Sequence, residues 1–570
     1  MRYPIQFLGV VSALVACTPQ VPVADPIGER AGCEPVLTDD NAWYASGKDE
    51  PLFEGLTGVH YTITTSSDSA QRYFDQGLTL AYGFNHAEAA RSFWQAGRED
   101  STCAMASRGF AYAPRPNYNA GMEADRYERA YTAIQKARSL AGTCTEKERA
   151  LINAMAARYS PEAPEDRSTL DKAYSEAMRT LSTRYPEDPD IAAMFAESLM
   201  DQHPWDLWAH DGTAKEWTPE ILAALESSMR TWPDHPGAHH FYIHAVEASR
   251  DPERGLPSAD LLRDRVPASG HLVHMPSHIY IRTGRYHDGV LANKRSVRVD
   301  SGYTAACHAQ GMYPIAYFPH NIHFLSACAA MEGNSATAWS SALHLREKVL
   351  GTGLLKEPGW ETLQHFWAYP LFVAVKFARW DDLGAEAPPD STMPYAMAIW
   401  EYAQGMSALG RSDITAAGQR LAALKTLASD TALQELKIWG INPASEVVRI
   451  AQEVLEGELL AAQNKHDEAI AILRIAAEHE DALNYQEPPD WSFPVRHTLG
   501  DVLVKAGRYD EAIATYDEDL AVWKENGWSL IGKKVALEAA GRKAEAADVR
   551  QRFERAWAHS DLPIGSSRIF

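Results

Sequence analysis

The stretch TLGDVLVKAGRYDEAIATYDEDL, residues 498–520, decides the fold. Apolar residues recur at three- and four-residue intervals on both sides of a GRYDEA turn, which predicts two amphipathic helices joined by that turn. The turn returns as GRKAEA at 541–546, so that Gly507 and Gly541 are 34 residues apart. A fixed period of this length indicates a chain built from repeated helix–turn–helix units.

Further copies of this unit occur toward the N-terminus. They lie at 457–476, 405–421, 327–343, 278–297 and 77–96. The period, and the small residues where the two helices approach closely, resemble the tetratricopeptide repeat (TPR). The resemblance covers most of 69–558, strongly at the C-terminal end and loosely at 105–230. It implies an all-α, right-handed superhelical solenoid in which each repeat buries its apolar face against its neighbours.

The chain of 570 residues is too long for one compact core. We expect a lipoprotein signal peptide at 1–16, followed by an N-terminal tether and irregular segment at 17–68. Three blocks of repeats then follow: a divergent block at 69–230, a histidine-rich block at 231–390 and a C-terminal block at 391–560.

The composition is that of a folded, acidic protein. Apolar residues make up 45% of the chain and aromatic residues 10%, which is typical of folded domains. The formal net charge is −22. Because an acidic protein repels phosphate backbones, nucleic acid is not expected as a partner.

The first twenty residues, MRYPIQFLGVVSALVACTPQ, predict export and lipid anchoring. A basic residue, Arg2, precedes an apolar run that is too short to span a bilayer but suits a signal peptide. The run ends in Leu-Val-Ala-Cys, which resembles a bacterial lipobox with Cys17 as the lipidated residue. A plain secretory signal is the alternative. Thr18 stands where an inner-membrane retention signal would have Asp, which favours the outer membrane.

The other five cysteines form no CxxC pair, so a cysteine-based zinc site is not expected. In an oxidising envelope, Cys103 can pair with Cys144 and Cys307 with Cys328, which leaves Cys33 odd. The sequence alone decides neither pairing.

Histidine is concentrated in one part of the chain, because 11 of the 21 histidines lie between residues 235 and 323. His240 and His274 are 34 residues apart, and so are His244 and His278. Two consecutive repeats therefore carry the same histidine pair at the same position. His271 lies three residues before His274, on the same helical face.

Neighbouring repeats extend this polar face. His320, His323 and His365 lie at similar distances before the turns of the next two units. Aligning the preceding unit places Glu197 at the level of His244, with Asp201 one turn further on. Glu247 follows His244 by three residues, on the same helical face. At these offsets the TPR resemblance implies residues that line the concave side of the solenoid.

Imidazoles at i and i+4 can share a Zn, Cu or Fe ion, and a carboxylate from a neighbouring helix can complete the site. The predicted metal ligands are His240, His244, His274, His278, His320, His323, Glu197 and Glu247, supported by His271 and Asp201. The alternative is a polar groove in which the histidines contact a bound peptide.

Two classes of function remain open. The first is a binding or scaffold protein of the bacterial cell envelope, which is anchored by lipid to the outer membrane and faces the periplasm. Its groove would hold a protein or peptide partner and a transition metal, and it would contact the membrane only through the anchor. The second is a metal-dependent hydrolase or oxidase that uses the histidine and glutamate groove, with Glu197 or Glu247 as a base. We expect the first.

Overall fold

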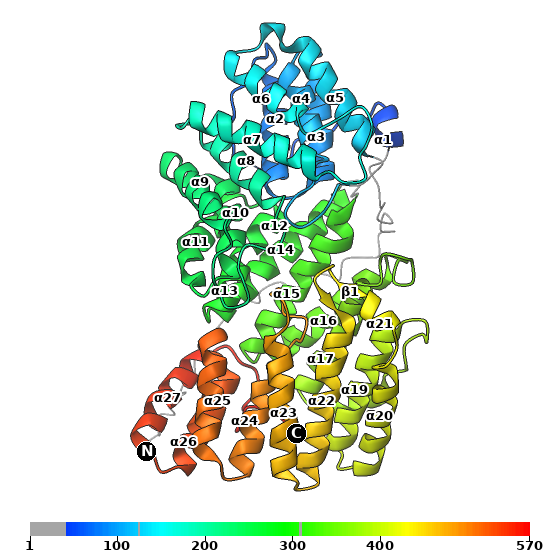
Figure 1. Cartoon of the computed structure of the whole chain (residues 1–570), viewed down its shortest axis with the longest axis vertical. Coiled ribbons are helices and arrows are strands. Elements are labelled where there is room, and N and C mark those ends of the chain that lie inside the picture. Colours follow the sequence, from blue (N-terminus) through cyan, green and yellow to red (C-terminus); the bar gives the residue numbers. More distant parts are fainter. Residues whose placement is uncertain (1–40, 57, 123–125, 307–310) are drawn as a thin grey trace, which may run out of the picture.

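The computed structural model describes residues 41–56, 58–122, 126–306 and 311–570. The predicted signal peptide, Cys17 and the first part of the predicted tether lie outside the described residues. Helices pair with their neighbours along the chain and stack into an elongated array (Figure 1). The first helices are α1 (Asn41–Ala45), α2 (Asp68–Tyr82), α3 (His86–Glu99), α4 (Ala104–Tyr112), α5 (Tyr127–Leu140), α6 (Glu146–Ala156), α7 (Ser168–Arg184), α8 (Pro189–Met200) and α9 (Thr218–Thr231).

The middle of the chain continues the helical array. Its helices are α10 (Pro236–Glu247), α11 (Leu256–Arg265), α12 (Gly270–His274), α13 (Pro276–Arg282), α14 (Tyr286–Ala306), α15 (Phe318–Met331), α16 (Ser335–Leu350), α17 (Leu363–Lys376) and α18 (Trp380–Ala385). Short 3₁₀ or π segments lie at η2 (Ala141–Thr143), η3 (Pro252–Gly255) and η4 (Tyr313–Tyr317).

The C-terminal part is equally regular. It contains α19 (Pro394–Gly410), α20 (Ile414–Leu427), α21 (Ala432–Glu435), α22 (Ala444–Ala462), α23 (His466–Asp481), α24 (Val495–Lys505), α25 (Tyr509–Val522), α26 (Gly527–Ala539) and α27 (Lys543–Ala556). Within the described ranges the only sheet is a two-residue antiparallel pair, β1 (Lys437–Ile438) with β2 (Asn442–Pro443).

Glycines determine both the turns and the close helix contacts of the repeat. Gly507 and Gly541 end their helices with φ of 74° and 78°, a left-handed conformation that glycine adopts without a steric cost. Gly500 and Gly532 face the ring of Tyr516, and a Cβ at either would lie 2.3 Å from the Tyr516 Cζ. The fold is an all-α solenoid of TPR-like helix pairs, which confirms the fold class predicted from the 34-residue period.

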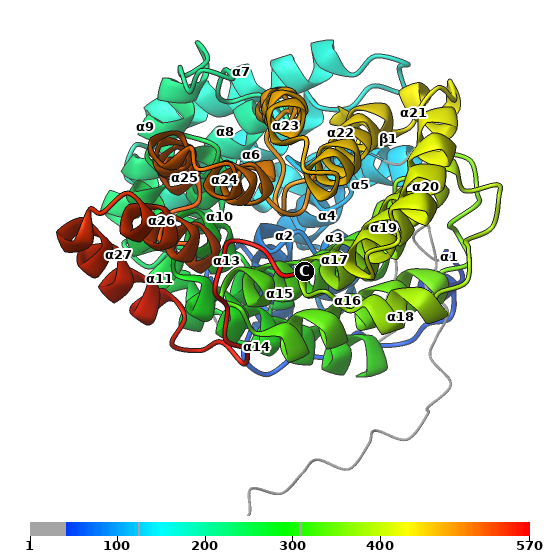
Figure 2. The same ribbon diagram turned by 90° about the horizontal axis from the view of Figure 1, so that it is seen from below.

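The C-terminal repeats curve back onto the middle of the chain, as the view along the array shows (Figure 2). Asp561 accepts hydrogen bonds from the backbone N–H groups of Ser335 and Ala336, both at 2.8 Å, at the start of α16. The indole of Trp528 donates to the carbonyl of Ala330 at the end of α15. These contacts join the last repeats to α15 and α16 and close this part of the solenoid.

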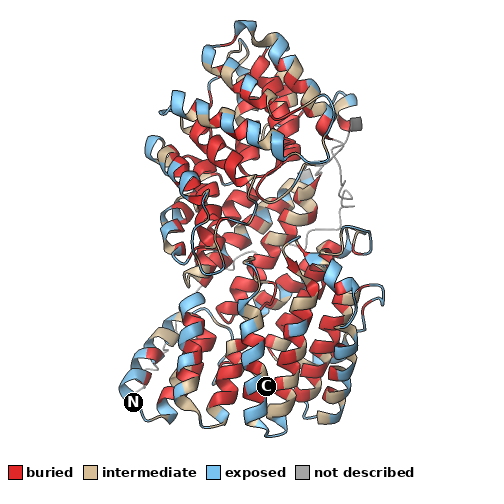
Figure 3. Cartoon of the chain, viewed as in Figure 1, coloured by how far each residue is buried: buried red, intermediate tan, exposed pale blue. Residues whose placement is uncertain are grey.

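The buried apolar side chains form two cores that meet in the histidine-rich repeats. The first core includes residues from Leu56 to Tyr280 together with Tyr313 and Tyr317, and the second runs from Ile281 to Val549. Burial follows the contacts between neighbouring helices along the whole array (Figure 3). The boundary between the two cores therefore lies within α13, the helix that carries His278.

Cys103, Cys144 and Cys328 are buried free thiols, so the Cys103–Cys144 pairing is not present. Cys307 and Cys33 lie outside the described residues. In the part of the chain that the structure covers, no helix is both long and apolar enough to cross a bilayer.

Candidate metal centre

Six histidines from four helices meet where the two cores join, and we call this group the histidine chamber. Its members are His240 and His244 on α10, His271 and His274 on α12, His278 on α13 and His320 on α15. All except the partly buried His320 are at most 1% exposed. The sequence identified all six, and the structure brings them together.

A proline divides the segment that carries half of the chamber. The sequence predicts one helical face for His271, His274 and His278, whereas α12 ends at His274 and α13 begins at Pro276, which has no N–H to donate. Met275 between them keeps a helical backbone, with φ −49° and ψ −36°. The three imidazoles therefore still point to one side.

Aromatic rings enclose the chamber. Phe84, which follows α2, lies with its ring centroid 4.5 Å from His240 and 5.6 Å from His271. On the other side, the Phe324 ring lies 4.5 Å from that of His278. These apolar walls keep water away from the imidazoles and strengthen electrostatic interactions between them.

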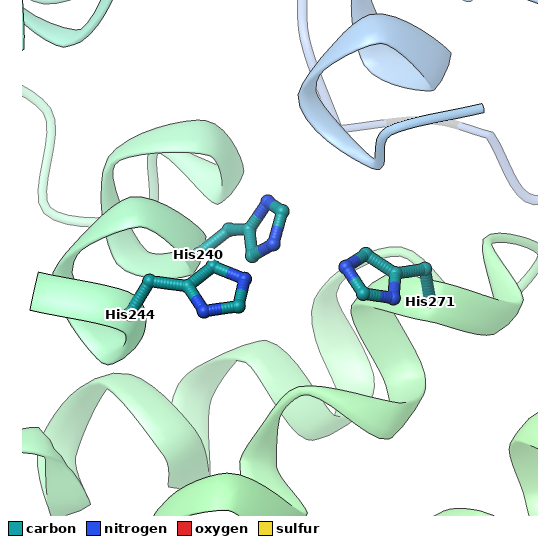
Figure 4. A group of neighbouring side chains, drawn as sticks. All are labelled: His240, His244 and His271. Carbon is teal, nitrogen blue, oxygen red and sulfur yellow. The ribbon is translucent and has the colours of Figure 1, made fainter. Parts of the chain in front are cut away.

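The first group of possible ligands contains His240, His244 and His271, whose rings face one another (Figure 4). One nitrogen from each lies within 4.8 Å of the others. The Nδ1 of His240 lies 2.6 Å from the carbonyl oxygen of Tyr82, and the Nδ1 of His244 lies 2.9 Å from Glu247 Oε1. Both contacts place the proton on Nδ1, so both Nε2 atoms keep a lone pair directed into the chamber. Within the described residues neither Nε2 has a hydrogen-bond partner.

The second group contains His274, His278 and His320, which also lie within 4.8 Å of one another through their ligand atoms. The Nε2 atoms of His274 and His278 are 2.9 Å apart, and those of His320 and His278 are 3.4 Å apart. The Nδ1 of His274 lies 2.6 Å from Asn293 Oδ1, which fixes its proton on Nδ1.

Imidazole Nε2 atoms at such short separations need a proton or a metal ion between their lone pairs, because two lone pairs repel each other. A proton on one ring satisfies one pair, whereas a metal ion satisfies all three. In a tetrahedral site with metal–nitrogen bonds of 2.0–2.1 Å, neighbouring nitrogens are about 3.3 Å apart, close to the separations in this group. The second group can therefore hold a metal ion with little movement of the side chains.

Glu247 connects the two groups. Its Oε1 lies 2.9 Å from the Nδ1 of His244, and its Oε2 lies 2.5 Å from the Nδ1 of His278. Burial would raise the pKa of Glu247, but His278 and His244 lower it to about 2. One carboxylate thus orients one imidazole in each group, as carboxylates commonly do behind metal-bound histidines.

The other imidazoles are held in the form that binds metals. Burial lowers the pKa of His240 and of His274 well below the usual value, and neighbouring imidazoles lower it further. His278 differs: burial would lower its pKa, but Glu247 and Glu487 raise it to about 9. A metal that binds His278 must therefore displace a proton at neutral pH.

Glu487 was missed by the sequence analysis. It lies in the loop between α23 and α24, its side chain is fully buried, and its Oε2 lies 3.2 Å from the Nδ1 of His278. Burial and the neighbouring Glu247 raise its pKa to about 7, although His278 lowers it. The sequence signal was the Trp/Pro-rich stretch that begins at Pro488, which suggests a loop over the histidines but not a contact with one.

The structure does not bring Glu197 or Asp201 into the chamber. Glu197 forms a buried ion pair with Arg115 and accepts a 2.7 Å hydrogen bond from the hydroxyl of Tyr112. Asp201 accepts a 2.8 Å hydrogen bond from the buried guanidinium of Arg158. Both carboxylates are thus occupied by arginines from neighbouring repeats.

His323 also lies apart from the two groups. Its ring lies 5.7 Å from that of His365 and 4.1 Å from that of Tyr369. The Nδ1 of His365 lies 2.9 Å from the hydroxyl of Tyr395. Among the described residues, neither His323 nor His365 belongs to a set of three side chains that can share an ion.

The sequence predicted an open groove lined by histidines, whereas the structure covers these histidines. Phe84 and Glu487 come from loops far apart in the sequence, and both cover histidines that the repeat pattern placed on a concave surface. A peptide therefore cannot reach the buried imidazoles in this conformation. The chamber suits an ion rather than a peptide, because its imidazoles are buried and the ligand atoms of each group lie within 4.8 Å of one another.

Comparisons with known proteins identify no family: no family model and no curated protein matches the chain. Among solved structures, the human IFIT1 dimer with m7Gppp-AAAA has 13% identity and a TM-score of 0.31, covering 86% of this chain and 91% of that one. The APC/C hetero-tetramer Cut9-Hcn1 has 14% identity and a TM-score of 0.31, covering 87% and 78%. Yeast Tom70 has 13% identity and a TM-score of 0.23, covering 85% and 90%. None of these similarities assigns a function to the chain.

Proposed function

We propose that this chain is a metal-binding solenoid protein whose histidine chamber holds two divalent transition-metal ions. His274, His278 and His320 hold one ion, and His240, His244 and His271 hold the other. The observation that carries the proposal is the short separation of the Nε2 atoms of the second group, at 2.9 and 3.4 Å, while Asn293 Oδ1 lies 2.6 Å from the Nδ1 of His274 and Glu247 Oε2 lies 2.5 Å from that of His278. Imidazole ligands suit zinc, copper and iron.

Metal content tests this proposal. The purified protein is stripped with a chelator, reloaded separately with zinc, copper(II) or iron(II), desalted and analysed for metal and protein. We expect two ions per chain for the metal that binds. A reloaded protein with no more metal than a double variant lacking His240 and His274 would refute the proposal.

The same proposal places the protein in the bacterial cell envelope. It is supported by the basic residue, the short apolar run and the Leu-Val-Ala-Cys sequence that ends at Cys17. The Pro-rich segment after Cys17 would act as a spacer between the lipid and the first repeat. In this arrangement the solenoid faces the periplasm from the outer membrane.

Replacing Cys17 by serine should remove the lipid anchor. We expect the wild-type chain in the outer-membrane fraction, and the Cys17→Ser chain either in the soluble fraction or as the uncleaved precursor. Cys33→Ser is the matched control, because Cys33 lies outside the lipobox, and it should fractionate like the wild type. Unchanged processing and fractionation of Cys17→Ser would exclude lipid anchoring at this residue.

Binding, not catalysis, is the function that we propose, with a protein or peptide as partner. The buried histidines cannot be the contact surface, so such a partner would bind the exposed faces of the repeats. The metal would then stabilise the junction of the two cores, where α10, α12, α13 and α15 meet.

A metal-dependent hydrolase or oxidase is the second candidate. It is favoured by one observation: each group supplies three imidazoles, and a three-ligand set leaves a coordination position for another molecule. Glu487, which has a pKa of about 7, is a buried acid–base group beside His278. Cleavage of activated esters by the reloaded protein, lost in His274→Ala, would support this candidate over binding alone.

A further inference from the structure

A buried lysine lies in the second core, outside the histidine chamber. Lys376 is the last residue of α17 and is 8% exposed. Its Nζ lies 2.9 Å from the Nδ1 of His497 and 3.7 Å from the ring centroid of Trp528. Within the described ranges, no carboxylate forms an ion pair with it.

His497 connects this amine to a buried carboxylate. Its Nε2 lies 3.3 Å from Asp519 Oδ2, which also accepts 2.6 Å hydrogen bonds from Asn526 and Ser529. Because the carboxylate attracts a proton to Nε2, the Nδ1 of His497 is free to accept a proton from Lys376. Carboxylate, imidazole and amine thus follow the order of an activated nucleophile.

A small cavity opens beside the amine. Its volume is ≈ 60 Å³, and it is partly open to solvent. Its lining is mainly aromatic and aliphatic: Phe372, Tyr402, Met406, Val454, Trp491 and Phe493. Its charged side chains besides Lys376 are Glu458 and Arg568, which pair with each other, and Arg568 also binds Asp501. The cavity therefore suits a small apolar molecule.

The surroundings of Lys376 favour the neutral amine. Burial lowers its pKa well below that of an ordinary lysine, and Asp519, which lies behind His497, offsets this only in part. Burial and the nearby lysine also lower the pKa of His497, to about 4, so the imidazole is neutral. A neutral amine has the lone pair that attack on a carbonyl carbon needs.

We propose that Lys376 is a nucleophilic lysine that forms an imine with a small apolar aldehyde bound in this cavity. The Nζ lone pair forms a bond to the carbonyl carbon, and the C=O π electrons move to the oxygen. His497 Nδ1 accepts one proton from the nitrogen and delivers it to the alkoxide oxygen, which gives a carbinolamine. The second N–H proton then passes by the same route to the hydroxyl, the nitrogen lone pair forms the C=N bond, and the C–O bond breaks to release water. Amine and aldehyde become imine and water, with no change of oxidation state.

Reductive trapping with propionaldehyde tests this assignment. The full chain is mixed with propionaldehyde and sodium cyanoborohydride at pH 7, and propylated lysines are located by peptide mass spectrometry. An exposed lysine with a pKa near 10.4 is only about 0.04% neutral at this pH, so we expect Lys376 to react at least about 10-fold faster than exposed ones. Lys505, whose side chain is 52% exposed, is the internal reference.

The pH profile gives a second readout that needs no variant. Labelling of an ordinary exposed lysine rises about tenfold per pH unit between pH 7 and 9, because its neutral fraction rises, and Lys505 is the exposed reference. Labelling of Lys376 should stay nearly constant. Equal labelling at pH 7, or a parallel rise of both residues with pH, would overturn the proposal whether or not the variants fold.

Two variants separate the roles of the residues. Lys376→Arg should lose the propyl label at this position and leave labelling of Lys505 unchanged. His497→Gln keeps a polar side chain but no proton acceptor of comparable basicity, and it should slow labelling of Lys376 about 100-fold. If His497→Gln folds as the wild type and labels Lys376 at the wild-type rate, His497 does not move the proton.

Discussion

Replacing His274 by alanine will reduce the metal content of the reloaded protein from two ions per chain to one. His274 supplies one of three Nε2 atoms in its group, and its removal leaves only His278 and His320. Loss of a residue that merely orients a metal ligand costs about 10–100-fold in affinity, so loss of a ligand should cost at least about 100-fold. Elemental analysis after desalting, with a competition titration for affinity, measures the effect.

Matched variants make this result specific. His365→Ala removes a buried histidine from the neighbouring helix α17 that belongs to neither group, so it should retain both ions. His240→Ala should lose the other ion. The double variant should then hold none, with helicity retained by circular dichroism. Equal metal content in His274→Ala and His365→Ala would show that the chamber binds no metal through His274.

Substitution of Glu247 tests whether one carboxylate links the two groups of histidines. Because its two oxygens hold His244 and His278, Glu247→Gln should weaken both ions together, each by about 10–100-fold. A variant of a direct ligand should weaken mainly one ion. Affinity loss at only one group in Glu247→Gln would mean that the carboxylate does not orient both imidazoles.

The fold was predictable because its signal is local and repeated. The 34-residue spacing of Gly507 and Gly541 requires a left-handed residue at each turn and small residues where the two helices touch. The structure confirms both. The histidine pairs could be placed for the same reason, since equivalent positions of adjacent repeats lie side by side.

What could not be predicted depends on contacts between distant parts of the chain. Glu487 approaches His278 from a loop more than two hundred residues away, and Phe84 approaches from the first repeats. Neither belongs to the repeat period, so the pattern indicated an open groove where the structure has a closed chamber. The repeat alignment placed Glu197 at the position equivalent to His244, but it could not show that Arg115 would pair with the Glu197 carboxylate.

The Glu197→Ala variant should keep both metal ions but lose much of the stability of the wild-type protein. The variant leaves the Arg115 guanidinium buried without its partner carboxylate and removes the acceptor of the Tyr112 hydroxyl. Breaking a buried ion pair by removing one partner costs about 3–5 kcal/mol. The midpoint of thermal or urea unfolding should therefore fall clearly below that of the wild type.

The contrast between Glu197→Ala and His274→Ala separates an ion-pair carboxylate from a metal ligand. Glu176→Ala is a suitable control for Glu197, because its carboxylate is exposed and pairs with Arg179 at the surface, where such pairs contribute about 0–1 kcal/mol. Glu176→Ala should unfold like the wild type. If Glu197→Ala instead lost metal and kept its stability, the carboxylate would have to reach the chamber, and the Arg115 pair would not be its principal contact. Because Arg115 and Glu197 are both almost fully buried, the physical expectation is the opposite, an unstable protein that still holds both ions.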